Sequence, residues 1–146
     1  MKVYFDTCSL NRPLDNKSQL RVALEAEAVL GVLSLCEAGD LFLVSSEALT
    51  LEVSRSPLRQ NKAYVSAILE RAIAVIAVDD GMIQRAEVLE SRGFKAFDSL
   101  HIASAESVRV DFFCTCDDRL LRKARLQLDL DVKVVSPLEL AIEVIK

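Results

Sequence analysis

The sequence predicts a single α/β domain, spanning residues 1–146, with a short and mainly parallel central sheet of about five strands flanked by helices on both faces. Two observations support this prediction. Apolar runs of four or five residues recur along the chain, and segments with helical spacing of apolar residues separate them. Strands that are apolar throughout, rather than at alternate residues, are typical of parallel sheets covered on both faces.

The five predicted strands are short and buried. They comprise residues 2–6, 41–44, 74–78, 111–115 and 132–135. Each is followed by residues that favour a turn or the start of a helix. This alternation indicates strand–helix–strand units, which connect parallel strands.

The longest predicted helix covers residues 18–38. Its apolar residues recur at three- and four-residue spacing, as expected of a helix with one face on the core, and Gly39 ends it. That predicted stripe consists of Leu20, Leu24, Ala28, Val32 and Leu35.

The remaining segments follow from their start and stop signals. We expect a loop at residues 11–16 and a helix that Ser45 and Ser46 cap and Ser56-Pro57 breaks. Further helices are expected at residues 61–71, 79–91, 98–107, from 117 to 125 and from Pro137 onward. Gly93 is expected to end the helix at residues 79–91. Asp98 is expected to cap its helix.

Composition narrows the class of protein. The 146 residues are 51% hydrophobic with four Gly and three Pro, which describes a compact chain rich in regular structure. A net charge of −4 argues against a protein that coats nucleic acid in general, since such proteins are usually basic. No apolar run approaches the ~20 residues that cross a bilayer, and Asp6 comes too early for the apolar core of a signal peptide. We therefore expect a cytoplasmic protein without a membrane.

The cysteines and the single histidine do not predict a metal centre of their own. Cys8, Cys36, Cys114 and Cys116 lie in apolar segments, where reduced cysteines act as small packing residues. Cys114 and Cys116 form one C-x-C pair without a second pair, and structural zinc needs four ligands. His101, between Leu100 and Ile102, is interpreted as a packed, hydrogen-bonded histidine.

Four carboxylates carry the functional hypothesis. Asp6, Glu52, Asp98 and Asp117 each stand where a strand gives way to a helix, or about one turn into a helix. The carboxyl ends of parallel strands line one crevice, so these side chains are expected to crowd together there. Like charges at close range require protons or a cation, and hard oxygen ligands favour Mg²⁺ or Mn²⁺. A metal-dependent phosphodiesterase with one or two ions is the resulting hypothesis.

Each carboxylate also has a purely structural interpretation. Glu47 and Glu52 share a helix, but five residues correspond to about 500° of rotation, so the two side chains point about 140° apart. Only one of them can therefore reach the crevice. Glu47 lies in the first turn, where acidic residues favour the helix dipole, which makes Glu52 the preferred ligand. Asp98 and Asp117 could be simple helix caps, and Asp79 occupies the same kind of position.

Several basic residues lie near these carboxylates in the sequence. They are either solvated helix faces or contacts to RNA phosphates beside an acidic centre. The candidates for RNA binding are Arg12, Arg55, Arg119, Arg122 and Lys123.

Four segments together resemble the PIN-domain ribonuclease family, in particular the VapC-type toxins of bacterial toxin–antitoxin systems. The segments are Phe5-Asp6-Thr7-x-Ser9, Ser45-x-x-x-Leu49-Thr50-Leu51-Glu52-Val53, Asp98-Ser99-Leu100-His101-Ile102-Ala103-x-Ala105 and Thr115-x-Asp117-x-x-Leu120. Their order and spacing cover the chain from residue 3 to about 136. The third segment is the most specific, because its small residues pack a helix with the aspartate at its open end.

The resemblance implies an activity and partners. Asp6, Glu52, Asp98 and Asp117 would bind Mg²⁺ or Mn²⁺ in an endoribonuclease, with Ser9, Thr115, Asp118 and Glu47 as secondary candidates. An RNA substrate, an antitoxin protein and a homodimer are also implied. Cys8 departs from the commoner small polar residue, and Asp118 next to Asp117 leaves the fourth ligand open between these two.

Two other functions remain open from the sequence. The first is a degenerate PIN-like module that binds RNA or protein without cutting. The second is a phosphohydrolase with Asp6 as nucleophile. That chemistry in the haloacid-dehalogenase class needs a second Asp two residues later, and Cys8 occupies that position.

Overall fold

In the computed structural model, which describes residues 1–145, five strands form one parallel sheet in the order β3-β2-β1-β4-β5. β1 is the central strand, and its Val3, Tyr4 and Phe5 pair with three consecutive residues of β4. The predicted fold class is therefore confirmed. The strands are β1 (Lys2–Phe5), β2 (Phe42–Ser46), β3 (Ala74–Ile76), β4 (Phe112–Cys114) and β5 (Lys133–Val135).

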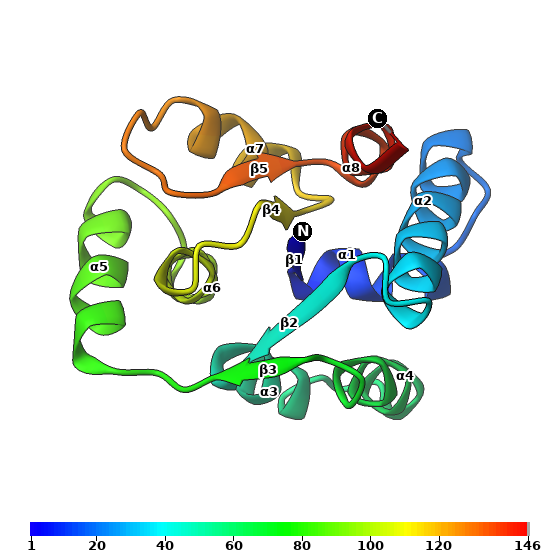
Figure 1. Ribbon diagram of the computed structural model, residues 1–146, viewed down its shortest axis with the longest axis horizontal. Helices are drawn as coiled ribbons and strands as arrows, with labels where there is room; N and C mark the ends of the chain where they lie inside the picture. Colours follow the sequence, from blue (N-terminus) through cyan, green and yellow to red (C-terminus); the bar gives the residue numbers. More distant parts are fainter. Residues whose placement is uncertain (146) are drawn as a thin grey trace.

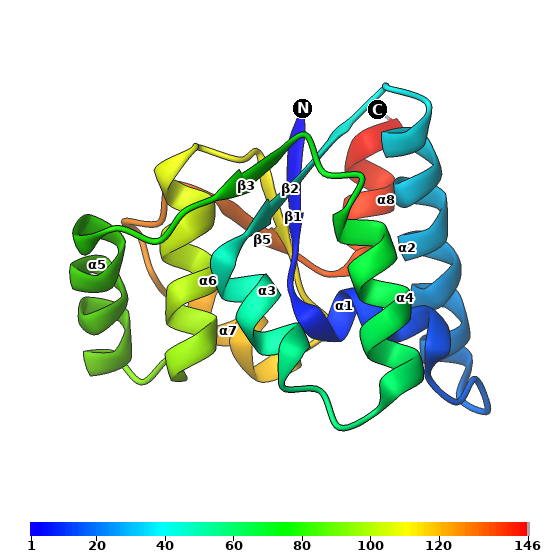
Figure 2. The same cartoon turned by 90° about the horizontal axis from the view of Figure 1, so that it is seen from below.

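Helices cover both faces of the sheet, as predicted. One face carries α2 (Leu20–Glu37), α4 (Arg59–Leu69) and α8 (Pro137–Ile145), and the other carries α5 (Asp80–Ser91) and α6 (Ala96–Ser107) (Figure 1). Three short helices begin within four residues of the end of a strand: α1 (Thr7–Asn11), α3 (Glu47–Ser54) and α7 (Asp118–Arg125). Figure 2 shows all three below the strands that they follow.

The centre of the sheet is the most deeply buried part of the chain. Tyr4, Phe5, Phe113 and Cys114 have no exposed surface, because helices cover β1 and β4 on both sides. Burial of this kind, roughly 2 kcal/mol for each large apolar side chain, fixes the central strands firmly. The residues that follow β1 and β4 are positioned by this rigid core.

Two predictions about the sheet and its longest helix need correction. Val75 in β3 is exposed, because β3 is an edge strand rather than a buried one. In α2, Leu20 and Leu24 are exposed, 75% and 46% respectively, whereas Glu25 is buried. The first half of α2 therefore turns a different face to the core than the apolar spacing predicts.

The segment after α1 is also more regular than predicted. Arg12–Leu14 form a 3₁₀ helix, η1, where a loop is expected. Pro13 fits in its first turn because the N–H that proline lacks would have no partner there. The helix ends predicted at Gly39 and Gly93 are confirmed, and both glycines have the positive φ, 85° and 97°, that other residues rarely adopt.

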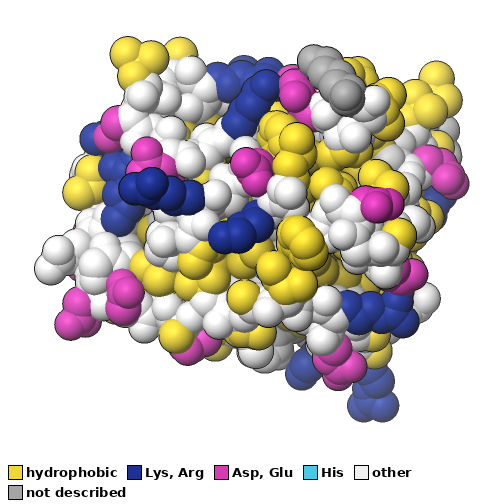
Figure 3. All heavy atoms as spheres, in the orientation of Figure 1, with side chains coloured by type: hydrophobic (Ala, Val, Ile, Leu, Met, Phe, Trp, Pro, Cys, Tyr) yellow, Lys and Arg dark blue, Asp and Glu magenta, His cyan; other side chains and the backbone are white. Residues whose placement is uncertain are grey.

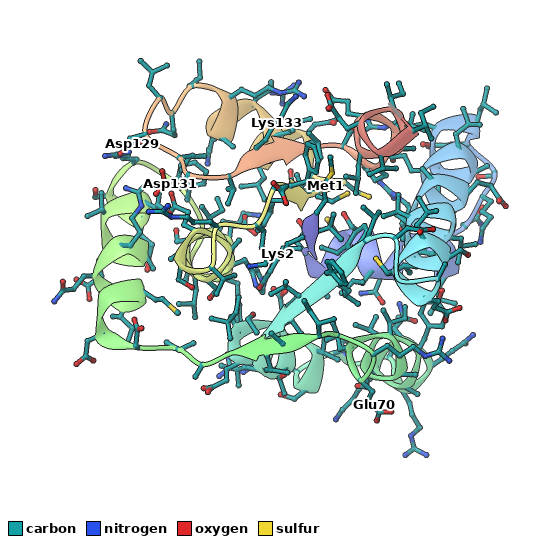
Figure 4. The ribbon with its side chains drawn as sticks, in the orientation of Figure 1. Met1, Lys2, Glu70, Asp129, Asp131 and Lys133 are labelled. Atoms are coloured by element: carbon teal, nitrogen blue, oxygen red, sulfur yellow. The ribbon has the colours of Figure 1, made fainter. Side chains whose placement is uncertain are left out.

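The strands begin at the opposite edge, which faces the viewer in Figure 1. Figure 4 labels Lys2 and Lys133, which begin β1 and β5, and Figure 3 shows apolar side chains gathered across this face between separate charged ones. The carboxylates singled out in the sequence follow the strands and lie toward the far edge.

Within residues 1–145, no helix has the length and apolar character needed to cross a membrane.

Candidate active site at the carboxyl edge of the sheet

Asp6 follows β1 directly and caps α1. Its Oδ1 accepts hydrogen bonds from the Ser9 backbone N–H (3.0 Å) and the Cys8 thiol (3.1 Å), and only 4% of the residue is exposed. Burial raises the pKa of Asp6, although hydrogen bonds from Thr115, Cys8 and the Ser9 N–H partly offset that rise. Ser9 uses its own hydroxyl to bind the Cys114 carbonyl (3.2 Å), so it joins α1 to β4.

Glu52 projects from the middle of α3. Its Oε1 lies 2.9 Å from His101 Nε2 and accepts a hydrogen bond from the Thr7 hydroxyl. Burial alone would raise the pKa of Glu52, but the hydrogen bonds from His101 and Thr7 outweigh it and hold this pKa below its usual range. Glu47, in the first turn of the same helix, is exposed. Of the two glutamates, Glu52 is the one directed inward.

Asp98 does not cap its helix, contrary to the prediction. α6 begins at Ala96 and its N-cap is Lys95, whose carbonyl accepts the Ser99 N–H at 2.8 Å. The helix begins earlier because Lys95 already has the extended backbone of a cap. The half-buried Asp98 side chain has no hydrogen-bond or ion-pair partner within residues 1–145. Capping therefore does not account for this aspartate.

The charge environment of Asp98 ties the four carboxylates together. Burial raises the pKa of Asp98 to about 6, with further upward contributions from Asp6, Asp117 and Glu52 and an opposing one from His101. Three carboxylates, at the starts of α1 and α7 and on α3, thus act electrostatically on the fourth, Asp98. No Lys or Arg of the described chain forms an ion pair with any of them.

Asp117 and Asp118 have different surroundings. Asp117 caps α7 by accepting the N–H groups of Arg119 (2.9 Å) and Leu120 (3.3 Å), and its own N–H donates to Thr115 Oγ1 (3.0 Å). Asp118 is bound through both of its oxygens to Arg21. Arg21 thereby lowers the pKa of Asp118 and occupies its carboxylate. Thr115 is fully buried beside Asp6 and Asp117 and links β4 to both.

The oxygens of these four carboxylates suit a hard divalent cation, but they are not gathered closely enough to surround one. Across residues 1–145, no three His, Cys, Asp or Glu side chains are arranged as a ready group that could hold a metal ion. Asp6 and Asp117 cap their own helices, and hydrogen bonds hold Glu52 against Thr7 and His101. The carboxylate oxygens are the ligand type that Mg²⁺ and Mn²⁺ prefer. Within residues 1–145, no Lys or Arg pairs with them to offset their negative charge. By chemistry these residues fit such an ion, and closing around it requires side-chain movement.

The basic residues chosen in the sequence differ in availability. Arg12 is ion-paired with Asp15 (3.0 Å) and with the buried Glu25 (3.1 Å), and Lys123 donates to the Gly93 carbonyl. Arg119 and Arg122 are exposed on α7. Arg55, also exposed, lies over the Phe97 ring at 5.7 Å.

Sequence reasoning missed how deeply Tyr4 and His101 are built into this edge. His101 is 1% exposed, and its two ring nitrogens contact the Tyr4 hydroxyl (2.7 Å) and Glu52 (2.9 Å). The expectation of a packed, hydrogen-bonded histidine is confirmed, but its link to a candidate ligand is not visible in the sequence. The sequence feature that could have indicated this link is the position of the single histidine, one helical turn after Asp98.

The chain is thus an α/β domain with a parallel sheet, and acidic side chains from four elements lie at the carboxyl edge of that sheet. The PIN domain family model matches residues 3–126, most of the chain. The protein belongs to the PIN domain family. PIN domains are in general nucleases, and they generally use divalent metal ions.

Solved structures share this fold at low sequence identity. VapBC2 from Rickettsia felis, solved bound to a DNA fragment from its promoter, is 17% identical with a TM-score of 0.62, covering 93% of this chain and 98% of that one. FitAcB from Neisseria gonorrhoeae is 18% identical with a TM-score of 0.57, covering 93% and 98%. No curated protein matches the sequence significantly.

Proposed function

We propose that this protein is a metal-dependent endoribonuclease that hydrolyses RNA phosphodiester bonds, and that it is the toxin of a toxin–antitoxin pair. The observation that carries the proposal is that the half-buried Asp98 has no hydrogen-bond or ion-pair partner within residues 1–145. Burial first, and then the charges of Asp6, Asp117 and Glu52, raise the pKa of this carboxyl. Clustered carboxylates without a paired cation cost stability, so their presence at the carboxyl edge of the sheet points to function. Membership of the PIN family supports hydrolysis of nucleic acid.

Asp6, Glu52, Asp98 and Asp117 would hold one or two Mg²⁺ or Mn²⁺ ions. Such an ion, when bound, lowers the pKa of water and offsets the charge that develops on the phosphate. The residues of the chain supply the geometry. Thr115 Oγ1 accepts the backbone N–H of Asp117 and so holds this residue in place. Asp98 is ionised at neutral pH and has no hydrogen-bond or ion-pair partner within residues 1–145.

RNA would approach this edge against its negative charge, so cations must flank it. Arg55, Arg119 and Arg122 are exposed and are the residues proposed to contact phosphates. Arg12 and Lys123 already have partners, so their contribution to RNA binding is expected to be smaller.

The test is cleavage of purified RNA by the purified protein. We expect cleavage with Mn²⁺ or Mg²⁺ and none with EDTA, with products cut inside the chain. Binding of RNA without any metal-dependent cleavage would identify a degenerate PIN module instead. Turnover of small phosphate esters without RNA cleavage would point to the phosphohydrolase alternative.

The partner proposed for this toxin is an antitoxin, as the names of VapBC2 and FitAcB indicate for those complexes. A hollow of about 700 Å³ between α2, α4 and β2 offers an apolar surface for a segment of such a protein. Its apolar lining includes Leu30, Leu33, Leu41, Leu43, Tyr64 and Ile68. Ala67 also lines it, whereas Ala63 on the same helix does not.

Co-purification with the small protein encoded beside the toxin gene tests this partner. Ala67→Trp should weaken the complex by filling the hollow, and Ala63→Trp is the matched control.

We also propose a homodimer, because a small chain that exposes Leu20, Leu24 and Val75 has apolar surface left to cover. Light scattering that shows a monomer at tens of micromolar would contradict the dimer.

A further inference from the structure

A chain of buried polar side chains runs from the centre of the sheet to Glu52. The Tyr4 hydroxyl lies 2.6 Å from Ser46 Oγ and 2.7 Å from His101 Nδ1, and His101 Nε2 lies 2.9 Å from Glu52 Oε1. Tyr4, Ser46 and His101 are each at most 1% exposed. They come from β1, β2 and α6, so the chain joins three elements behind the α3 residue Glu52.

The donors and acceptors in this chain have one consistent arrangement. An ionised Glu52 can only accept, so His101 Nε2 must carry the proton toward it. Ser46 Oγ already accepts the Leu49 N–H (3.1 Å), and Tyr4 is the only remaining partner for the Ser46 proton within residues 1–145. Ser46 therefore donates to Tyr4, and Tyr4 donates to His101 Nδ1. This assignment rests on hydrogen-bond geometry.

Both hydrogen bonds to Glu52 fall on the same oxygen. Thr7 and His101 each contact Oε1, and Oε2 has no hydrogen-bond partner within residues 1–145. A glutamate side chain in a half-exposed position has several rotamers, so fixing one oxygen restricts where the other can point. The result is a carboxylate with one anchored oxygen and one free oxygen.

We propose that Tyr4 and His101 are positioning residues that hold Glu52 by Oε1, so that Oε2 remains free to bind the divalent cation. The inference rests on the proposed function, because it assigns Glu52 to the metal site of that nuclease. Histidines that orient a ligand from behind act in this way: the ring does not touch the substrate, and its effect passes through the carboxylate. Tyr4 acts one step further back, since its hydroxyl fixes which nitrogen of His101 carries the proton.

The test compares three variants of the full chain by Mn²⁺ calorimetry without RNA and by kcat and KM for RNA cleavage. His101→Leu removes the N–H and should weaken Mn²⁺ binding by about 10- to 100-fold. His101→Gln places an N–H near the lost Nε2 and should restore most of the affinity. Tyr4→Phe should cause a smaller loss, of about 3- to 10-fold. Losses should fall on kcat more than on KM.

A control and a double variant separate positioning from packing. Ser104→Ala removes a buried hydroxyl on the same helix, bound to the Leu100 carbonyl (2.8 Å), and should leave Mn²⁺ affinity unchanged. Tyr4→Phe should add nothing to His101→Leu, because Tyr4 acts through His101.

The outcomes distinguish this inference from the proposed function. The positioning role alone is overturned if the wild type binds Mn²⁺ and cuts RNA while Tyr4→Phe and His101→Gln keep the same affinity and kcat. In that case His101→Leu is either unchanged as well or unable to fold. A wild-type protein that neither binds Mn²⁺ nor cuts RNA overturns both. If His101→Leu does not fold, affinity lost in Tyr4→Phe and largely kept in His101→Gln supports the inference.

Discussion

Arg21 and Asp118 form a two-pronged ion pair that joins α2 to α7. Arg21 Nη1 and Nη2 each lie 2.7 Å from one oxygen of Asp118. Both side chains are about half exposed, so the pair adds little stability by itself. Its consequence concerns the candidate site. Because both oxygens of Asp118 are engaged, the adjacent Asp117 is the residue that contributes to the field at Asp98.

Asp117→Asn should therefore abolish metal-dependent cleavage, whereas Asp118→Asn should retain most of it. Asparagine caps a helix about as well as aspartate, so α7 should keep its start in the Asp117 variant. We expect a loss of about 100-fold or more for Asp117→Asn and less than about 3-fold for Asp118→Asn. Initial rates on one RNA at saturating Mn²⁺ measure both. A larger loss in Asp118→Asn would reverse the assignment.

Asp6→Asn and Asp98→Asn should each abolish metal-dependent cleavage while the fold stays intact. The substitution keeps the size of the side chain and removes the charge that a divalent cation needs. We expect at least about a 100-fold fall in cleavage rate for each. Circular dichroism of the purified variants checks that the fold is retained.

Asp79→Asn is the matched control for both variants. Asp79 also stands at the start of a helix, is exposed and caps α5 by accepting the Met82 N–H at 2.8 Å. Since it is not among the proposed ligands, the cleavage rate of this variant should remain close to that of the wild type. Equal rates for wild type, Asp79→Asn and Asp98→Asn would refute the assignment of this site.

The stability of the metal-free protein should depend on Asp98 and pH. Burial and neighbouring carboxylates raise the pKa of Asp98 from 3.8 to about 6. The folded state therefore binds this proton more tightly than the unfolded state does, and its stability falls as pH rises from about 4 to about 6. Asp98→Asn removes that penalty, so it should melt a few degrees above the wild type at pH 7 and match it near pH 4.

Thermal melts across this pH range, with and without Mn²⁺, measure the effect. Added Mn²⁺ at pH 7 should raise the Tm of the wild type more than that of Asp98→Asn, because binding to the folded state stabilises it in proportion to affinity. A Tm difference between the two metal-free proteins that does not change with pH would contradict the raised pKa of Asp98.

Much of the fold was predictable because its signals are local. Short apolar runs predicted all five strands, and Gly39 and Gly93 predicted two helix ends. The start of α6 was mispredicted, since Asp98 is a common cap residue whereas the actual cap, Lys95, has no capping side chain. The exposed Leu24 was mispredicted because apolar spacing alone does not reveal a buried ion pair on the same helix.

The candidate site was predictable only in part. The four carboxylates were selected from motifs along the chain, and Glu52 was preferred because the helix dipole accounts for Glu47 in the first turn. The contacts of Glu52 depend on Tyr4 and His101, which lie 48 residues before it and 49 residues after it in the sequence. Which partners meet across such separations is decided by the pairing of β1 with β2 and by the packing of α6, not by local pattern.

The last prediction concerns Glu25, the buried carboxylate on α2. Its Oε1 lies 3.1 Å from Arg12 Nη2 and 3.4 Å from Arg21 Nε, so it joins α2 to η1 and forms ion pairs with two guanidinium groups. Glu25→Gln leaves the partly buried Arg12 without this charge and should lower the free energy of unfolding by about 1–3 kcal/mol. Glu27→Gln, at an exposed position two residues later on the same helix, should change it by less than about 0.5 kcal/mol. Urea unfolding followed by circular dichroism measures both, and equal midpoints for the two variants would show that the ion pair contributes no net stability.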